Sequence, residues 1–180
     1  MKVIKYIAIF VLLILLTVLL VAAFVPSKFL VVREVKINKP KVEVFEYTKL
    51  LKNQNNFSVW SKMDLNMKKE FKGLDGTVGF VSAWESENPD VGKGEQEIIA
   101  IDEGNRIDYE LRFLEPFAST SPAYMIFSSI DSSTTSVQWA FDGDMPYPMN
   151  LMLLFVNMDE ELGKDLSGGL TNLKEILEKQ

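Results

Sequence analysis

Two of the side chains that enzymes use most often for catalysis, those of His and Cys, are absent from this 180-residue chain. Their absence excludes His-based acid–base chemistry, Cys nucleophiles, and thiolate or imidazole metal sites. The carboxylates of Glu161 and Asp165, one turn apart on an expected helix, could do acid–base work or hold a hard cation together with Asp159 and Glu160. Such a run more often forms the solvated face of an amphipathic helix, so we expect no metal and no other cofactor.

A second group of residues suits the binding of an apolar ligand. Aromatic rings offer large apolar surfaces, and methionines adapt to a ligand of loosely specified shape. Packing in an ordinary hydrophobic core would explain each of these side chains by itself, but together they are candidates for the wall of a cavity. The candidate cavity-lining residues are Trp60, Trp84, Tyr109, Trp139, Phe141, Met149 and Met152.

The charge balance restricts the partners of the chain. Its formal net charge is −6 and its isoelectric point is near 4.8, whereas a nucleic-acid-binding surface needs a basic face. We therefore expect no nucleic-acid partner. An acidic domain is also suited to staying soluble beside an anionic membrane rather than lying flat on it.

The elements that position these residues begin with an apolar N-terminal segment. Residues 6–25 contain one residue outside the hydrophobic class, Thr17, and as a helix they span roughly the 30 Å hydrocarbon core of a bilayer. Lys2 and Lys5 precede the segment and Val21-Ala22-Ala23 loosely resembles a cleavage site, so a signal peptide is the alternative. Because the stretch exceeds the roughly 7–15 apolar residues of a signal peptide, we favour an uncleaved membrane anchor.

The flanking charges give the orientation of this anchor. Lys2 and Lys5 lie on a very short tail and favour a cytoplasmic N-terminus. The basic residues between positions 28 and 41 favour the opposite sense, but they belong to the expected folded domain, whose translocation is less sensitive to charge. We therefore expect the domain on the extracytoplasmic side.

The remainder of the chain has the pattern of one α+β domain. A β-branched strand at residues 30–37 and a short helix at 42–50 come first, followed from residue 67 by strands separated by turn signals. Alternation is strictest at residues 107–113, where every second residue is apolar. A helical segment from Pro148 to about Lys179 carries a leucine stripe. This order favours an antiparallel sheet with helices on one face.

Particular segments resemble the START-like (SRPBCC) superfamily, and within it bacterial proteins described as polyketide cyclase/dehydrase. The first is the strand ending at Ile37-Asn38-Lys39-Pro40 and followed by Val44-Phe45. The meander of about six strands before a long C-terminal helix is similar as well. The other matching segments are Ser58-Val59-Trp60-Ser61, residues 64–67, 106–117 and 139–143, and the helical stretch 158–166.

The resemblance implies a helix-grip fold, in which a curved antiparallel sheet of six to seven strands wraps around the long C-terminal helix with an apolar cavity between them. It assigns residues 28–180 to this domain and residues 1–27 to the single transmembrane helix that precedes it. A short apolar N-terminal helix also occurs in that bacterial subgroup, which places the chain in a bacterial cytoplasmic membrane as a single-pass protein. The matched segments contain packing and turn residues and imply no reaction.

Three functions are compatible with these features. The first is a membrane-tethered module that binds a hydrophobic small molecule or lipid in the sheet–helix cavity, with the membrane contacted through residues 6–25. The second is a cyclase or dehydratase that uses Asp, Glu or Tyr in the same cavity, with Tyr109 as the first candidate. The third is a protein-interaction module that presents the apolar segment around residues 146–156. The absence of His and Cys favours the first, so we expect binding rather than catalysis.

Overall fold

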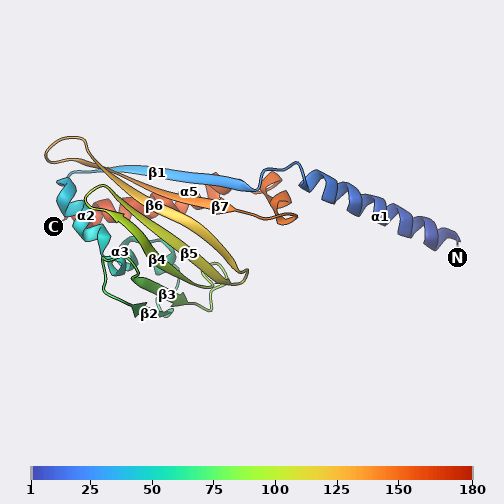
Figure 1. Ribbon diagram of the computed structural model, residues 1–180, viewed down its shortest axis with the longest axis horizontal. Helices are drawn as coiled ribbons and strands as arrows, with labels where there is room; N and C mark the ends of the chain where they lie inside the picture. Colours follow the sequence, from blue (N-terminus) through green and yellow to red (C-terminus); the bar gives the residue numbers. More distant parts are fainter. Residues whose placement is uncertain (1, 180) are drawn as a thin grey trace.

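The computed structural model describes residues 2–179, which form a curved antiparallel sheet packed on one face against a long C-terminal helix (Figure 1). The sheet has seven strands in the order β1-β7-β6-β5-β4-β3-β2. The elements are α1 (Lys2–Ala22), β1 (Lys28–Ile37), α2 (Lys41–Lys49), η1 (Leu51–Asn53), α3 (Gln54–Phe57), α4 (Trp60–Met63), β2 (Lys68–Lys72), β3 (Val81–Glu85), β4 (Lys93–Asp102), β5 (Arg106–Glu115), β6 (Ser119–Ser129), β7 (Thr135–Asp144), η2 (Met149–Leu154) and α5 (Met158–Glu178).

This architecture confirms the predicted α+β fold class, with the helix-grip arrangement of sheet and C-terminal helix. The alternation in residues 107–113 does place its apolar members on the inner face of β5, where Ile107 and Tyr109 are buried. The first and last strands of the chain are neighbours in the sheet, because β1 pairs with β7 over its whole length from Lys28 opposite Asp144 to Ile37 opposite Thr135.

The solid part of the core lies at the end of the sheet away from α1. The leucine stripe of α5 is buried there against the inner face of the sheet, together with Phe45 of α2, whose ring meets Phe127 of β6 edge-on at 5.2 Å between centroids. Burying each such side chain contributes roughly 1.5–3 kcal/mol. The buried leucines of α5 are Leu166, Leu170, Leu173 and Leu177.

Helix α1 extends away from the domain and exposes its apolar side chains (Figure 1). The stretch Val3–Ala22 is long and apolar enough to cross a membrane, and a signal sequence would meet the same criteria. The division of the chain at residue 27 into a membrane anchor and a folded domain stays a prediction, as does the extracytoplasmic side.

The prediction that the C-terminal helix begins near Pro148 is wrong. Asn157 is the N-cap of α5, and its side chain accepts a hydrogen bond from the Glu160 amide, so the helix begins at Met158. Residues 149–154 form the separate 3-10 helix η2 beside α1. The physical reason is that the amides in the first turn of a helix have no carbonyl partner within the helix. The Asn157 side chain accepts the hydrogen bond of one of them, the Glu160 amide, and so favours a helix start at this position.

Candidate functional site

A cavity of about 270 Å³ lies between the inner face of the sheet and the helices α3, α4 and α5. It is at the end of the sheet toward α1, where β5 and β7 end and the β3–β4 loop contributes Asp90 and Val91. Its size is close to the lower limit of the roughly 300–1,000 Å³ typical of small-molecule pockets. It therefore suits a compact ligand or one end of a longer molecule.

One cross-strand row of residues builds the floor of the cavity. Lys69 of β2 pairs with Trp84 of β3, Trp84 with Gly94 of β4, and Gly94 with Phe113 of β5. These residues share one face because directly opposed residues in antiparallel strands point the same way. A Cβ at Gly94 would lie 2.6 Å from Cζ2 of Trp84, so the missing side chain is what allows the indole to lie across β4 toward Phe113.

Aromatic rings contact one another around most of the cavity wall. Trp84 meets Phe113 edge-on at 6.2 Å between ring centroids, and Phe113 lies 6.3 Å from Phe141 of β7. Trp139 of β7 meets Trp60 of α4 edge-on at 6.2 Å. The indole Nε1 of Trp84 donates to the carbonyl oxygen of Val91 at 3.2 Å, which ties the β3–β4 loop to the wall. All three tryptophans of the chain therefore line this cavity.

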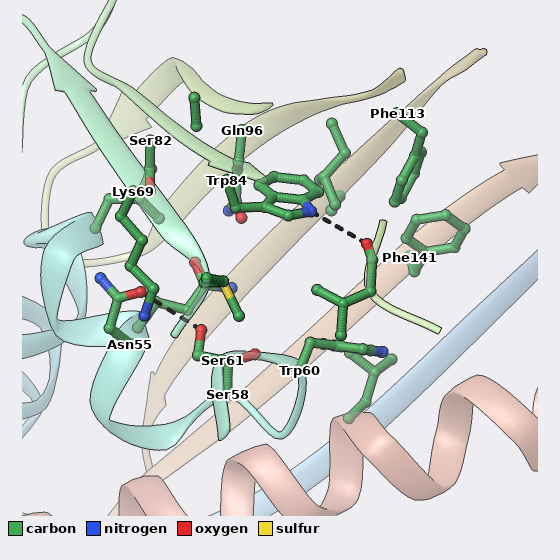
Figure 2. A pocket seen from close by; sticks show the side chains of 18 of the residues that line it. Asn55, Ser58, Trp60, Ser61, Lys69, Ser82, Trp84, Gln96, Phe113 and Phe141 are labelled. Atoms are coloured by element: carbon green, nitrogen blue, oxygen red, sulfur yellow. Dashed lines mark hydrogen bonds between the residues drawn. The ribbon is translucent and has the colours of Figure 1, made fainter. Parts of the chain in front are cut away.

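Polar groups gather at the opposite side of the cavity, around Lys69 (Figure 2). Lys69 makes no ion pair in the part of the chain that the structure describes, and its side chain stays partly exposed at the cavity edge. Partial burial lowers the pKa of its amine, an effect that Asp64 opposes. Gln96 is only 7% exposed and faces the cavity. The other polar lining residues on this side are Asn55, Ser58, Ser61 and Ser82.

The structure brings together four of the seven residues predicted to line a cavity, namely Trp60, Trp84, Trp139 and Phe141. Tyr109 is instead packed in the core. It points to the same face of β5 as Leu111 and Phe113, but the cavity begins only at Leu111, two residues further along the strand. Met149 and Met152 belong to η2 and are exposed beside α1 rather than on the inner stripe of a long helix. These three residues therefore do not border this cavity.

Sequence reasoning missed Lys69 and Ala123, which line the cavity, and Gly94, which makes room for its wall. Lys69 lies in a short edge strand of mostly charged residues. This strand has no alternation of apolar residues that would indicate its inner face. Ala123 of β6 lies opposite Tyr109 of β5 and Phe141 of β7. Because its side chain is small, the part of the cavity above it stays unfilled. Gly94 did carry a signal, since a glycine inside a strand often marks the close approach of another group.

The acidic residues considered as a catalytic or metal-binding group lie outside the cavity. Asp159 receives two hydrogen bonds from the Arg33 guanidinium at 2.9 and 3.0 Å, and this contact lowers the pKa of the Asp159 carboxyl. Burial, with repulsion from Glu161, raises the pKa of Asp165. The Arg33–Asp159 contact joins β1 to the start of α5 and so holds the helix against the sheet.

Comparisons with known proteins support the fold but assign no family. No family model matches the sequence, and no curated protein matches it. Solved structures match over the domain. A norcoclaurine synthase from Thalictrum flavum has a TM-score of 0.61 and 8% identity, covering 84% of this chain and 95% of that one. Ara h 8.0201 has a TM-score of 0.56 and 14% identity, covering 85% and 99%.

A protein from Thermobifida fusca solved in solution has a TM-score of 0.58 and 15% identity, covering 83% of this chain and 93% of that one. At such low identities the likeness concerns the fold alone. It agrees with the helix-grip arrangement that the START-like resemblance implied, while the narrower polyketide cyclase/dehydrase group stays a prediction.

Proposed function

We propose that this protein is a membrane-tethered module that binds a hydrophobic small molecule or lipid in the cavity between sheet and helix. The observation that carries the proposal is the cavity itself, which has an apolar wall of contacting aromatic rings and a few polar groups on one side. Ligand sites have this composition, in which apolar surface supplies affinity and a few polar groups orient the ligand. The lining set that we propose comprises Trp60, Trp84, Trp139 and Phe141, with Lys69 and Gln96 at the polar side.

The tether rests on α1. Its residues Val3–Ala22 are apolar apart from Lys5 and Thr17, and all of them except Ala22 are exposed. A soluble protein would therefore expose nearly the whole helix to water at a high free-energy cost. The proposed site for the protein is the bacterial cytoplasmic membrane, with the domain on its extracytoplasmic side.

Catalysis in the same cavity is the second candidate. The favouring observation is that the cavity holds ionisable groups, since Lys69 and Asp90 both line it, and a norcoclaurine synthase has the same fold. The route through Tyr109 loses support, because its phenol is buried in the core and burial raises its pKa. Binding needs no proton transfer and is therefore the function that the geometry supports best.

The binding proposal is tested with the full chain in lipid nanodiscs and a bromine-substituted medium-chain fatty acid. Bromine quenches tryptophan fluorescence on contact, and all three tryptophans line the cavity, so quenching reports occupation of this site. We expect saturable quenching, and native mass spectrometry of the purified protein should show a co-purified apolar molecule. Quenching that rises linearly with the probe and matches its partition into empty nanodiscs, with no co-purified molecule, would overturn the proposal.

Replacing Lys69 with Met is expected to weaken binding of the anionic probe about tenfold. A hydrogen bond to a charged group contributes about 1.5–3 kcal/mol. Because Lys69 is partly exposed, solvent screens this interaction, and we expect it to contribute about 1.4 kcal/mol, which corresponds to a tenfold change in affinity. Binding of the neutral methyl ester should not change. Lys68→Met is the matched control, because Lys68 faces away from the cavity and pairs with Glu85 at 3.3 Å.

The preference for acid over ester should also fall as the pH rises. Burial lowers the pKa of Lys69, so its amine loses its charge at a lower pH than an ordinary lysine with a pKa of about 10.4. The charge that attracts the anion is present below the Lys69 pKa and is lost above it. An acid-to-ester ratio that is the same in wild type and Lys69→Met at every pH would show that Lys69 does not contact the ligand's anionic end.

A further inference from the structure

The segment between β7 and α5, residues 145–157, is the most apolar stretch of the chain outside α1. It contains no charged residue, and its large side chains point outward rather than into the core. Phe155 is 87% exposed, more than any other large apolar residue of the domain. The exposed large apolar side chains of this segment are Tyr147, Met149, Met152, Leu154 and Phe155. A domain that met only water here would gain nothing from them.

Asn150 fixes this segment against the end of α1. Its side chain is 3% exposed, and its Nδ2 donates to the carbonyl oxygens of Ala22 and Val25, both at 2.7 Å. The carbonyl of Ala22, the last residue of α1, has no acceptor role within the helix itself, and Val25 belongs to the connection to β1. The amide of Asn150 therefore ties η2 both to the end of α1 and to the residues that follow it. Figure 1 shows η2, drawn in orange, beside the C-terminal end of α1. Along the axis of α1, η2 therefore lies at the same height as the C-terminal end of that helix.

The charges at the borders of this region mark where water begins. Lys28 is the first charged residue after α1 and Asp144 is the last one before the segment. They lie opposite each other in the β1–β7 pair. Everything between this pair and α1 is uncharged, including Phe24, which is exposed next to the helix end. Aromatic residues, Met and Leu without charges suit the boundary between lipid headgroups and acyl chains.

We infer that residues 145–157 and Phe24 insert into the headgroup–acyl boundary of the same bilayer that holds α1. This inference rests on the proposed membrane tether, because only a spanning α1 brings its end, and therefore η2, to the level of the boundary. The contact gives the domain a second attachment next to the span. A single helix with a flexible connection would let the domain turn freely, whereas two attachments joined by Asn150 fix its orientation.

This orientation has a consequence for the ligand cavity. The end of β7 at Asp144, the end of β5 at Glu115 and the start of β4 at Lys93 all lie at the end of the sheet from which α1 leaves. Phe113 and Phe141 line the cavity close to these strand ends. The inferred contact would therefore bring the end of the cavity that holds Phe113 and Phe141 nearest to the bilayer, which is the phase in which an apolar ligand is concentrated.

The chain has no Cys, so single-cysteine variants of the full protein can carry an environment-sensitive fluorophore without a prior cysteine deletion. The test uses nanodiscs of phosphatidylcholine and phosphatidylglycerol with nitroxide lipids that quench either near the headgroup or near the acyl terminus. Phe155→Cys and Met152→Cys report the segment, and Thr17→Cys reports α1. Ser132→Cys, in the β6–β7 loop at the opposite end of the sheet, is the control in water.

We expect the fluorophore at positions 155 and 152 to be quenched at least twofold more by the headgroup-level nitroxide than the fluorophore at position 132. The fluorophore at position 17 should respond most to the deep nitroxide. A quenched position 17 with positions 155 and 152 as open to an aqueous quencher as position 132 would overturn the inference and leave the tether intact. An unquenched position 17 would overturn the tether and the inference with it.

A protein partner is the competing occupant of this surface. It would shield positions 155 and 152 from the aqueous quencher in native membranes but leave them open in nanodiscs of pure lipid. That pattern would also overturn the inference.

Discussion

Ala123→Phe is expected to abolish binding of the brominated probe while the domain stays at least as stable as wild type. Ala123 is 4% exposed and lines the cavity between Tyr109 and Phe141 of the neighbouring strands. A phenyl ring on this position points into the space that the ligand would occupy. We expect affinity to fall at least about 100-fold, which is about 2.7 kcal/mol, measured by the quenching titration in nanodiscs.

The stability of this variant separates cavity filling from misfolding. Burying a Phe side chain contributes roughly 1.5–3 kcal/mol, and strain in fitting the ring offsets part of it. The melting temperature without ligand should therefore stay the same or rise by a few degrees, at about 2–4 °C per kcal/mol for a chain of this size. Ala123→Leu should give an intermediate loss of affinity at similar stability.

Ala100→Phe is the matched control, because Ala100 is an exposed residue of β4 and does not line the cavity. It should bind the probe as the wild type does. A folded Ala123→Phe protein that binds with wild-type affinity would place the ligand elsewhere on the molecule.

The alternation of residues 107–113 was sufficient to predict which face of β5 is buried, because side chains alternate across a strand. It does not say where along that face the solid core ends. Tyr109 packs in the core whereas Leu111 and Phe113 border the cavity. That border depends on Gly94 and on other small residues of neighbouring strands, and register between strands is a tertiary property.

The position of the two methionines depended on where the last helix begins. The apolar residues 149–156 continue the helical pattern of α5, and periodicity cannot distinguish an early helical turn from a separate 3-10 helix docked on α1. The sequence did hold a usable signal, since Asn157 followed three residues later by Glu160 has the spacing of an N-terminal capping motif. Giving that motif priority over the apolar pattern would have ended the segment at Asn157.

Lys69 could not be found from the sequence for a different reason. Strand β2 reads Lys-Lys-Glu-Phe-Lys and is exposed along its length, so neither face of it has an apolar pattern. Its orientation follows only from the pairing that puts Lys69 opposite Trp84. A polar group that orients a ligand is therefore the part of such a site that sequence patterns predict least well.

Gly169→Val is expected to destabilise the domain by about 3 kcal/mol, which corresponds to a melting temperature roughly 6–12 °C lower. A Cβ at Gly169 would lie 2.7 Å from Cζ3 of Trp139, against about 3.5–4.0 Å for carbon atoms in contact. Gly is disfavoured in a helix by about 1 kcal/mol relative to Ala, so helix propensity does not explain its presence and the approach of Trp139 does. Thr171→Val places the same side chain on the exposed face of α5 and should be nearly neutral.

The indole of Trp139 cannot move away easily, because Phe57 and Trp60 meet it edge-on at 5.8 and 6.2 Å between centroids. Trp139→Phe removes the ring that carries Cζ3, so in the Gly169→Val background it should restore part of the lost stability. The two changes should then be coupled by at least about 1 kcal/mol in a double-mutant cycle measured by chemical unfolding. Additive losses would show that Gly169 is required for some other contact. Since Trp139 also lines the cavity, Gly169→Val should weaken probe binding as well, and Thr171→Val should not.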